Sequence, residues 1–297
     1  MRKLIDYLFD QDVEYKTDVQ LKPYSSINIG GVADLITFPG DIDKLINLID
    51  FLEDNGYRYR VVGRMTNILP PDFRYNGVII NTAKINSFYI ENNSVICECG
   101  VVFSKLILKL AKLDIGGFEN LFSIPGSIGG MIYSNAGAYG NEISDFLTKA
   151  TVYVIKDKKK AVLNASDLRF SYRYSSLKKG GLILLDCELK IKRKAKENIL
   201  IEIGKIKERR KSSQPTDAPS LGSVFKRTDL HPASFLIDKA GLKGSRVGDA
   251  QISEKHAGFI VNLGNASASD YMTLVDLIKR EIFNKYGVVL EEEIEKL

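Results

Sequence analysis

The chain has 297 residues, of which 44% are hydrophobic and 27% are charged, and its net charge is +5 at pH 7. This composition is typical of an ordinary globular protein, and the length allows one large domain or two to three smaller ones. The positive charge is modest and its basic stretches carry few aromatic residues for base stacking, so we expect anionic small molecules as partners and no nucleic acid.

The cysteines and the apolar segments bear on where the protein works. Three cysteines, Cys97, Cys99 and Cys187, are too few for a disulfide framework and indicate a reducing compartment. No second Cys or His pair lies near Cys97 and Cys99 in sequence, so no metal site is expected. The first ten residues lack the apolar segment of a signal peptide, and no stretch reaches the roughly 20 apolar residues of a membrane span. We therefore expect a cytoplasmic protein with no membrane partner.

The pattern of hydrophobic residues predicts helices and strands in alternation in the first part of the chain. A short helix and a polar loop are expected within residues 1–20, and an amphipathic helix is expected over 41–55, ending at Gly56. Strands are expected at 57–63 and at 77–80. This order indicates an α+β or α/β first module.

A strand-rich region and then a more helical one follow. Residues 88–192 read mainly as strands, and 195–212 read as a highly charged helix followed by turn residues. We place the start of a C-terminal module there. Two further helices are predicted in it, at 232–240 and at 269–286.

Three glycine-rich segments suit close approach of the backbone to a ligand, namely residues 25–31, 63–67 and 125–140. Glycines let successive N–H groups converge on an anion, so these loops can cradle a pyrophosphate, although each can also be only a tight turn. None fits the dinucleotide fingerprint GxGxxG after a strand, or the P-loop. The residues by themselves predict a phosphate-containing ligand and nothing narrower.

Seven segments occur in an order that is specific when taken together. They are YSSINIGGVAD, VVGRMTNIL, GFENLFSIPGSIGGMIYSNAGAYGNEI, FSYRYSSLK, PSLGSVFKR, GDAQISEKHAGFIVNLGNASASD and YGVVLEEEIE. This series resembles that of the UDP-N-acetylenolpyruvoylglucosamine reductases, the MurB family, and runs from about Asn28 to Glu295. The resemblance implies an α+β fold, with a two-subdomain FAD-binding domain of the PCMH or vanillyl-alcohol-oxidase type and a C-terminal α+β substrate-binding domain. The expected ranges are 1–82 and 83–194 for the FAD-binding subdomains and 195–297 for the UDP-sugar domain.

The resemblance also implies an activity. The protein is expected to be an oxidoreductase that uses NADPH and FAD to reduce UDP-N-acetylglucosamine enolpyruvate to UDP-N-acetylmuramate, in peptidoglycan precursor synthesis. Its partner is then a small UDP-sugar, and we expect a monomer.

Site residues are implied by the matching motifs. Arg173 in FSYRYS would stabilise negative charge beside the substrate carboxylate, and Glu293 in the terminal LExE would hydrogen-bond the same intermediate or orient Arg173. Ser223 in GSVFK would protonate the neighbouring carbon, with Lys226 supporting the alkoxide. The expected cofactor-binding residues are Gly30, Gly63, Arg64, Thr66, Asn67, Pro125, Gly126, Ser127, Gly129, Gly130, Asn135, Ala136, Gly137 and Ala138. The expected substrate-binding residues are Tyr172, Lys226, Arg227, Gln251 and His256.

Two features set this chain apart within the family. Met65 stands where the family usually has the second Gly of a Gly-x-Gly-Ser-Asn loop, and Thr66 replaces the Ser. Met would be strained there if the position needs positive φ, yet we expect flavin binding to persist. The interval of 50 residues between Arg173 and Ser223 indicates the shorter branch, without the Tyr-bearing loop that closes over the substrate.

Other functions stay open at this point. One is another FAD oxidoreductase of the same fold, and a second is a non-catalytic binding relative that has lost flavin, which Met65 motivates. The GSVFK and KHAGFIVN segments favour the UDP-sugar, and a pure binding protein has no need of Ser223 with Arg173. A third, nucleic-acid binding through the basic stretch 190–211, predicts strongly salt-dependent DNA binding.

Overall fold

The computed structural model describes residues 1–229 and 231–297 and divides into two compact units. The first unit comprises Met1–Thr17, Leu35–Arg64 and Gly77–Lys207, and the second comprises Asp18–Asp34, Met65–Asn76 and Glu208–Leu297. The three narrower ranges expected from the sequence, 1–82, 83–194 and 195–297, stay a prediction.

The N-terminal elements form a four-stranded sheet, in the order β1-β2-β5-β3, with two helices. Their bounds are α1 (Arg2–Asp10), β1 (Glu14–Gln20), β2 (Val32–Phe38), α2 (Ile42–Asp54), β3 (Tyr59–Val62) and β5 (Tyr75–Asn81). The predicted helix over 41–55 is confirmed as α2. The Asp41 carboxylate caps it by accepting from the Lys44 N–H at 2.7 Å, and Leu45, Leu48, Ile49 and Leu52 form its buried face. Each such buried side chain contributes about 1.5–3 kcal/mol.

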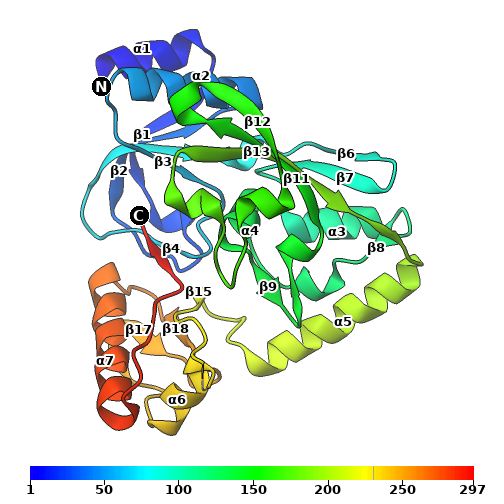
Figure 1. Cartoon of the computed structure of the whole chain (residues 1–297). Helices are drawn as coiled ribbons and strands as arrows, with labels where there is room; N and C mark the ends of the chain where they lie inside the picture. Colours follow the sequence, from blue (N-terminus) through cyan, green and yellow to red (C-terminus); the bar gives the residue numbers. More distant parts are fainter. Residues whose placement is uncertain (230) are drawn as a thin grey trace. The chain divides into compact units, whose positions relative to one another are not determined.

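A five-stranded sheet, in the order β12-β11-β13-β7-β6, dominates the first unit (Figure 1). Its strands are β6 (Phe88–Glu91), β7 (Ser94–Glu98), β11 (Leu147–Val154), β12 (Lys159–Asn164) and β13 (Leu182–Lys190). The other elements of this region are α3 (Phe103–Ala111), β8 (Ile115–Gly116), α4 (Ile128–Ser134), β9 (Gly137–Ala138), β10 (Asn141–Glu142), β14 (Lys192–Arg193) and α5 (Lys196–Ser213). All pairings in the large sheet are antiparallel, and Cys187 lies opposite Cys97 in it. The three cysteines are free and buried, so they serve as apolar core residues.

The second unit is built around a four-stranded antiparallel sheet, in the order β15-β18-β17-β16. Its elements are β4 (Ile68–Leu69), β15 (Ser220–Ser223), α6 (Ala233–Lys239), β16 (Arg246–Val247), β17 (Ala250–Ile252), β18 (Phe259–Asn262), α7 (Ala268–Tyr286) and β19 (Glu295–Lys296). The predicted helices at 232–240 and 269–286 are confirmed as α6 and α7. Helix α7 lies beside β17 and β18 in Figure 1 and contributes Tyr271, Leu274 and Ile278 to the core of this unit.

Both ends of α7 are fixed by local chemistry. Ser267 and Asp270 form a reciprocal capping box at its start, and Gly287, at φ +68°, ends it in the left-handed conformation. The carboxylate of Asp72 adds a second cap, because it accepts from the N–H groups of Ala268 and Ser269 at 2.7 and 2.9 Å. A negative charge at this end also interacts favourably with the positive end of the helix dipole.

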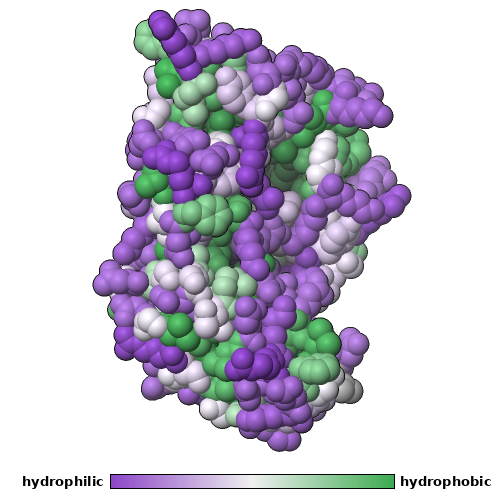
Figure 2. All heavy atoms as spheres, turned by 90° about the vertical axis from the view of Figure 1, so that its left-hand side faces the viewer, coloured by the Kyte–Doolittle hydropathy of each residue, from purple (hydrophilic) through white to green (hydrophobic). Residues whose placement is uncertain are grey.

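The described helices include none that is long and apolar enough to cross a membrane. On the face shown in Figure 2, hydrophilic and hydrophobic side chains are interspersed, without a continuous hydrophobic belt.

Candidate active site

Arg173 lies in a tight turn of the first unit. Ser171 and Tyr174 exchange two backbone hydrogen bonds of 3.1 and 3.0 Å, so Tyr172 and Arg173 form a two-residue turn between them. Of these two residues only Arg173 has positive φ, +56°, which is the pattern of a type II turn and normally selects Gly or Asn. An L-residue with a bulky side chain costs about 1–2 kcal/mol in this conformation. Arginine is therefore less stable at this position than Gly or Asn would be, which indicates that its side chain is needed for another reason.

Contacts within the first unit orient the guanidinium of Arg173. Its Nη2 donates to the carbonyl of Gly137 at 3.1 Å, and its Cζ lies 4.9 Å from the ring centroid of Tyr172. A guanidinium presents five N–H donors in a rigid plane, and these two contacts orient that plane. Such a group suits a carboxylate or an enolate oxygen.

Two of the predicted flavin segments meet in the first unit. A Cβ on Gly63 would lie 2.3 Å from the Oγ of Ser127, so a side chain at position 63 is excluded unless Ser127 moves. Gly63 and Arg64 follow β3, whereas Pro125, Gly126 and Ser127 lead into α4, which contains Gly129 and Gly130. The sequence places these segments far apart, and the fold brings Gly63 against Ser127.

The hydroxyl of Ser127 has the properties expected of a donor to a phosphate-containing group. Its Oγ is buried and has no hydrogen-bond partner within residues 1–229 and 231–297. A buried donor without a partner costs about 1–3 kcal/mol, and an anionic oxygen approaching the glycine loops would remove that cost. The donor type and its place beside two glycine segments fit the diphosphate of FAD.

Residues 135–138, near the end of the glycine-rich segment 125–140, have another set of contacts. Asn135 ends α4 in the left-handed conformation, is fully buried and bonds through its side chain to three protein groups. Ala136 is buried as well, whereas Gly137 and Ala138 form β9 and are half-buried. The Asn135 side chain, predicted to bind the cofactor, thus lies in the protein interior.

The segments that carry Ser223 and Glu293 are neighbours in the second unit. Glu293 donates its N–H to the carbonyl of Val224 at 2.8 Å, and Lys226 donates its N–H to the carbonyl of Glu291 at 2.9 Å. Together with the bridge between Phe225 and Glu292, these bonds pair residues 224–226 with 291–293 in antiparallel fashion. Glu293 is therefore placed opposite Val224, the residue that follows Ser223, although Val224 and Glu293 are 69 positions apart.

Residues 63–67, the first of the predicted flavin loops, pass from the first unit into the second, where they hydrogen-bond to the backbone of Glu293. The amide of Asn67 donates to the carbonyl of Glu293 at 3.0 Å, and the Asn67 carbonyl accepts from the Glu295 N–H at 2.9 Å. The Thr66 carbonyl accepts from the hydroxyl of Ser26 at 3.4 Å. In this structure, residues 66 and 67 of the predicted flavin loop are thus bonded to segments of the second unit.

Met65 adopts the positive-φ conformation in which a methionine is expected to be strained. Its φ is +45°, and its side chain is buried. Position 65 therefore requires positive φ, and Met pays the steric cost that a Gly would avoid. Packing explains the glycine at position 30, since a Cβ there would lie 2.9 Å from the Cβ of Leu21.

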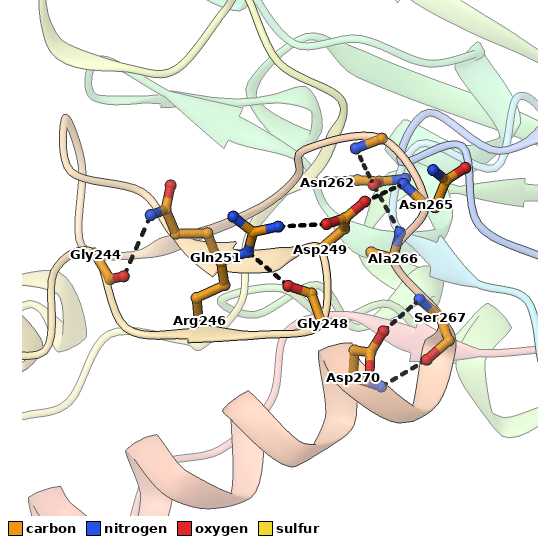
Figure 3. A network of polar contacts seen from close by, with 11 residues as sticks. Gly244, Arg246, Gly248, Asp249, Gln251, Asn262, Asn265, Ala266, Ser267 and Asp270 are labelled. Carbon is orange, nitrogen blue, oxygen red and sulfur yellow. Dashed lines mark hydrogen bonds and ion pairs between the residues drawn. The ribbon is translucent and has the colours of Figure 1, made fainter.

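The predicted substrate residues of the second unit differ in their surroundings. The ammonium of Lys226 forms an ion pair with Glu291, and Arg227 is exposed. Gln251 donates from Nε2 to the carbonyl of Gly244 at 3.2 Å (Figure 3). An incoming phosphate would compete with Glu291 for Lys226, whereas Gln251 is already oriented.

His256 is held as a neutral ring. Burial lowers its pKa, and its Nδ1 accepts a hydrogen bond from the Gly258 N–H at 3.1 Å. The neutral ring then carries its proton on Nε2, which is a donor. The ring also packs edge-on against Phe259, with centroids 4.9 Å apart.

A polar network that was given no role from the sequence orders the loops around Gln251 (Figure 3). Arg246 donates from Nε to the carbonyl of Gly248 at 2.6 Å and forms an ion pair with Asp249. Asp249 also accepts from the Asn265 N–H at 2.9 Å, and this bond with the nearby Arg246 holds its pKa below the usual range. Apart from Arg246, these residues lie in the GDAQ and NLGNAS segments, but their mutual contacts depend on the sheet.

The catalytic candidates divide between the two units. The first unit holds Arg173 on its turn, and the second holds Ser223 and Glu293 on paired segments. Within the described residues there is no group of three or more His, Cys, Asp or Glu side chains that could hold a metal ion.

Two protein-family models match this chain. The model of an FAD binding domain matches residues 33–157, and that of the UDP-N-acetylenolpyruvoylglucosamine reductase C-terminal domain matches residues 214–297. The predicted α+β fold, with an FAD-binding domain followed by a C-terminal domain, is confirmed by these matches.

Full-length relatives agree as well. Proteins named UDP-N-acetylenolpyruvoylglucosamine reductase from Caldicellulosiruptor bescii and Thermotoga sp. (strain RQ2) are 41% and 38% identical, over 97% and 99% of this chain and 92% and 97% of their own lengths. The crystal structure of UDP-N-acetylenolpyruvylglucosamine reductase (MurB) from Thermus caldophilus superimposes with a TM-score of 0.81 at 32% identity, covering 96% of this chain and 98% of that one. The chain therefore belongs to the UDP-N-acetylenolpyruvoylglucosamine reductase family.

Proposed function

We propose that this protein uses NADPH and FAD to reduce UDP-N-acetylglucosamine enolpyruvate to UDP-N-acetylmuramate, a step of peptidoglycan precursor synthesis. The observation that carries the proposal is the antiparallel pairing of 224–226 with 291–293, which brings Glu293 from a distant segment opposite Val224, the residue next to Ser223. The shared name of the full-length relatives supports it. We further propose that the protein acts as a monomer in the cytoplasm, in keeping with its three free cysteines.

FAD, when bound, supplies hydride transfer, in which a hydride from NADPH reaches the methylene carbon of the enolpyruvyl group. The residues that would hold it are Gly30, Gly63, Arg64, Thr66, Asn67, Pro125, Gly126, Ser127, Gly129, Gly130, Ala136, Gly137 and Ala138. Among them, Ser127 has a buried hydroxyl without a partner in the described residues, which suits a phosphate oxygen.

Arg173 has the electrostatic role. Addition of hydride to the methylene carbon leaves negative charge on the adjacent carbon and on the substrate carboxylate. A guanidinium that is already oriented by Gly137 and Tyr172 stabilises this charge without having to reorganise during the reaction. Tyr172 would also contact the substrate.

Ser223 completes the reduction by donating its hydroxyl proton to that adjacent carbon. A serine hydroxyl is a weak acid, so the alkoxide it leaves requires nearby positive charge or a proton donor. Lys226 is three residues further along the same segment and is kept in place by Glu291. Glu293 would hydrogen-bond the intermediate or order a water molecule beside it.

The remaining polar residues would bind the UDP-sugar. Arg227 and Lys226 offer positive charge to the diphosphate. Gln251 offers an oriented amide, and His256 offers a neutral Nε2–H donor to an uncharged sugar or uracil group.

An anaerobic absorption experiment tests the proposal. The flavin bands of the purified protein should bleach with NADPH and return when UDP-N-acetylglucosamine enolpyruvate is added. The Ser223→Ala variant is the matched control: its bands should bleach normally but return at least about 10²-fold more slowly, since general acid catalysis contributes about 10²–10⁴-fold.

Other outcomes of this experiment would contradict the proposal. A colourless protein that stays colourless with excess FAD would favour the non-catalytic relative, for which Met65 at positive φ is the structural motive. Flavin bands that bleach with NADPH but do not return with the enolpyruvyl sugar would favour an FAD oxidoreductase with another substrate.

A further inference from the structure

The central glycine segment holds the Arg173 turn at three places within the first unit. The hydroxyl of Ser175 donates to the carbonyl of Tyr133 at 2.8 Å, and the amide of Asn135 donates to the carbonyl of Ser171 at 3.0 Å. The guanidinium of Arg173 donates to the carbonyl of Gly137 at 3.1 Å. Alternate residues of the segment from 133 to 137 therefore contact the turn from 171 to 175.

Asn135 is the central and most constrained of these contacts. It is 0% exposed, and its Nδ2 uses both hydrogens, one for Ser171 and one for the carboxylate of Glu142 at 2.7 Å. Its Oδ1 accepts from the Ser144 N–H at 3.3 Å. A side chain with no exposed surface and with its polar atoms bonded inside the protein cannot donate to a cofactor without leaving this arrangement.

The turn needs such support because Arg173 has positive φ. A non-glycine residue stays in a sparsely populated conformation only where its surroundings hold it there. The carbonyl of Ser171 is the acceptor of the bond that closes the turn, and the Asn135 amide binds that same carbonyl. Loss of the amide would free the residue at which the turn begins.

We propose that Asn135 is a positioning residue that sets the orientation of the Arg173 guanidinium, and not a ligand of the flavin. The inference rests on the proposed function, because it assigns Asn135 an effect on the reaction only through Arg173. It predicts that the contribution of Asn135 to turnover disappears once the guanidinium is gone.

The test is a double-mutant cycle of Asn135→Gly and Arg173→Ala. Glycine tolerates the left-handed conformation of Asn135, at φ +46°, so Asn135→Gly removes the side chain with little backbone cost. Asn92→Gly is the matched control, because Asn92 is also an asparagine at positive φ, +52°, but is exposed in the turn between β6 and β7.

Two half-reactions are measured by stopped-flow absorbance, flavin reduction by NADPH and flavin reoxidation by the enolpyruvyl sugar, together with flavin content. Asn135→Gly should retain its flavin and slow reoxidation by about 10²-fold, the usual effect of misplacing a catalytic group by about 1 Å. The same substitution in the Arg173→Ala background should change the reoxidation rate by less than about 3-fold. Asn92→Gly should behave as wild type throughout.

Each contrary result has a distinct meaning. Unchanged reoxidation in Arg173→Ala would refute the role of Arg173 and, with it, this part of the proposed function. Slow reoxidation in Arg173→Ala but not in Asn135→Gly, or slowing by Asn135→Gly that is equally large without the arginine, would overturn the positioning role. Loss of flavin from Asn135→Gly, with normal rates in the fraction that keeps it, would return Asn135 to the cofactor site.

A second variant keeps the inference testable if Asn135→Gly does not fold. Ser175→Ala removes one buried hydroxyl and its bond to the Tyr133 carbonyl from the other side of the turn. It should slow reoxidation in the wild-type background and have no further effect in Arg173→Ala. Additive slowing in both backgrounds would overturn the inference.

Discussion

Position 65 offers a stability test in which replacement by glycine should be less destabilising than replacement by alanine. Met65 is 2% exposed and has a φ of +45°. Both Met65→Ala and Met65→Gly remove its buried side chain, at a cost of about 1.5–3 kcal/mol. Alanine keeps the steric cost of the left-handed conformation, about 1–2 kcal/mol, whereas glycine avoids it.

Glycine has an opposing disadvantage, because it loses about 0.5–1 kcal/mol more than alanine through the greater freedom of the unfolded chain. The steric term is the larger, so Met65→Gly should be the more stable variant by about 0.5–1 kcal/mol, and both should be less stable than wild type. In a helix or a strand the order of Ala and Gly is the opposite. The sign of the difference therefore reports the backbone at this position.

Thermal unfolding followed by circular dichroism measures the difference. A gap of this size moves the midpoint by about 1–3 °C in a protein of this length. The scans are repeated at several FAD concentrations, since any change in flavin affinity also shifts the midpoint and depends on FAD concentration. A Met65→Ala variant that is more stable than Met65→Gly after extrapolation to zero FAD would refute the reasoning.

Three further predictions concern single contacts. Gly63→Ala should lower flavin content, because its Cβ would lie 2.3 Å from Ser127 Oγ. Adding Ser127→Ala should not restore the flavin, since the phosphate donor is then missing, and full flavin in the double variant would contradict the role of Ser127. Asp72→Ala should lower the stability of the second unit by about 1 kcal/mol through loss of the second α7 cap, measured by urea unfolding. An unchanged midpoint would show that the capping box of Ser267 and Asp270 is sufficient. The lowered pKa of His256 means that the unfolded chain binds a proton more readily, so His256 should reduce stability as pH falls from about 6.5 through the folded pKa. Thermal midpoints at pH 5 to 8 should therefore fall less steeply toward acid for His256→Gln than for wild type, and parallel profiles would contradict this assignment.

Local patterns were sufficient for much of the architecture. The spacing of hydrophobic residues and the flanking Asp41 and Gly56 predict α2, and the same kind of signal predicts α7, which ends at Gly287. The signals that predict these elements lie within a few residues of one another in the sequence. Helix α7 is additionally capped by the distant Asp72, which the local pattern does not predict. The motifs in order were also enough to identify the family and to select Arg173, Ser223 and Glu293 as candidates.

Tertiary structure decided how those residues are arranged. Glu293 meets Val224, the residue next to Ser223, only because 224–226 pairs with 291–293. Gly63 meets Ser127 only because separate loops converge. The sequence also suggested Asn135 as a cofactor ligand, whereas the fold buries its side chain against the Arg173 turn. Hydrogen-bond partners of this kind come from segments distant in the chain, and hydrophobic periodicity carries no information about which distant carbonyl an amide will meet.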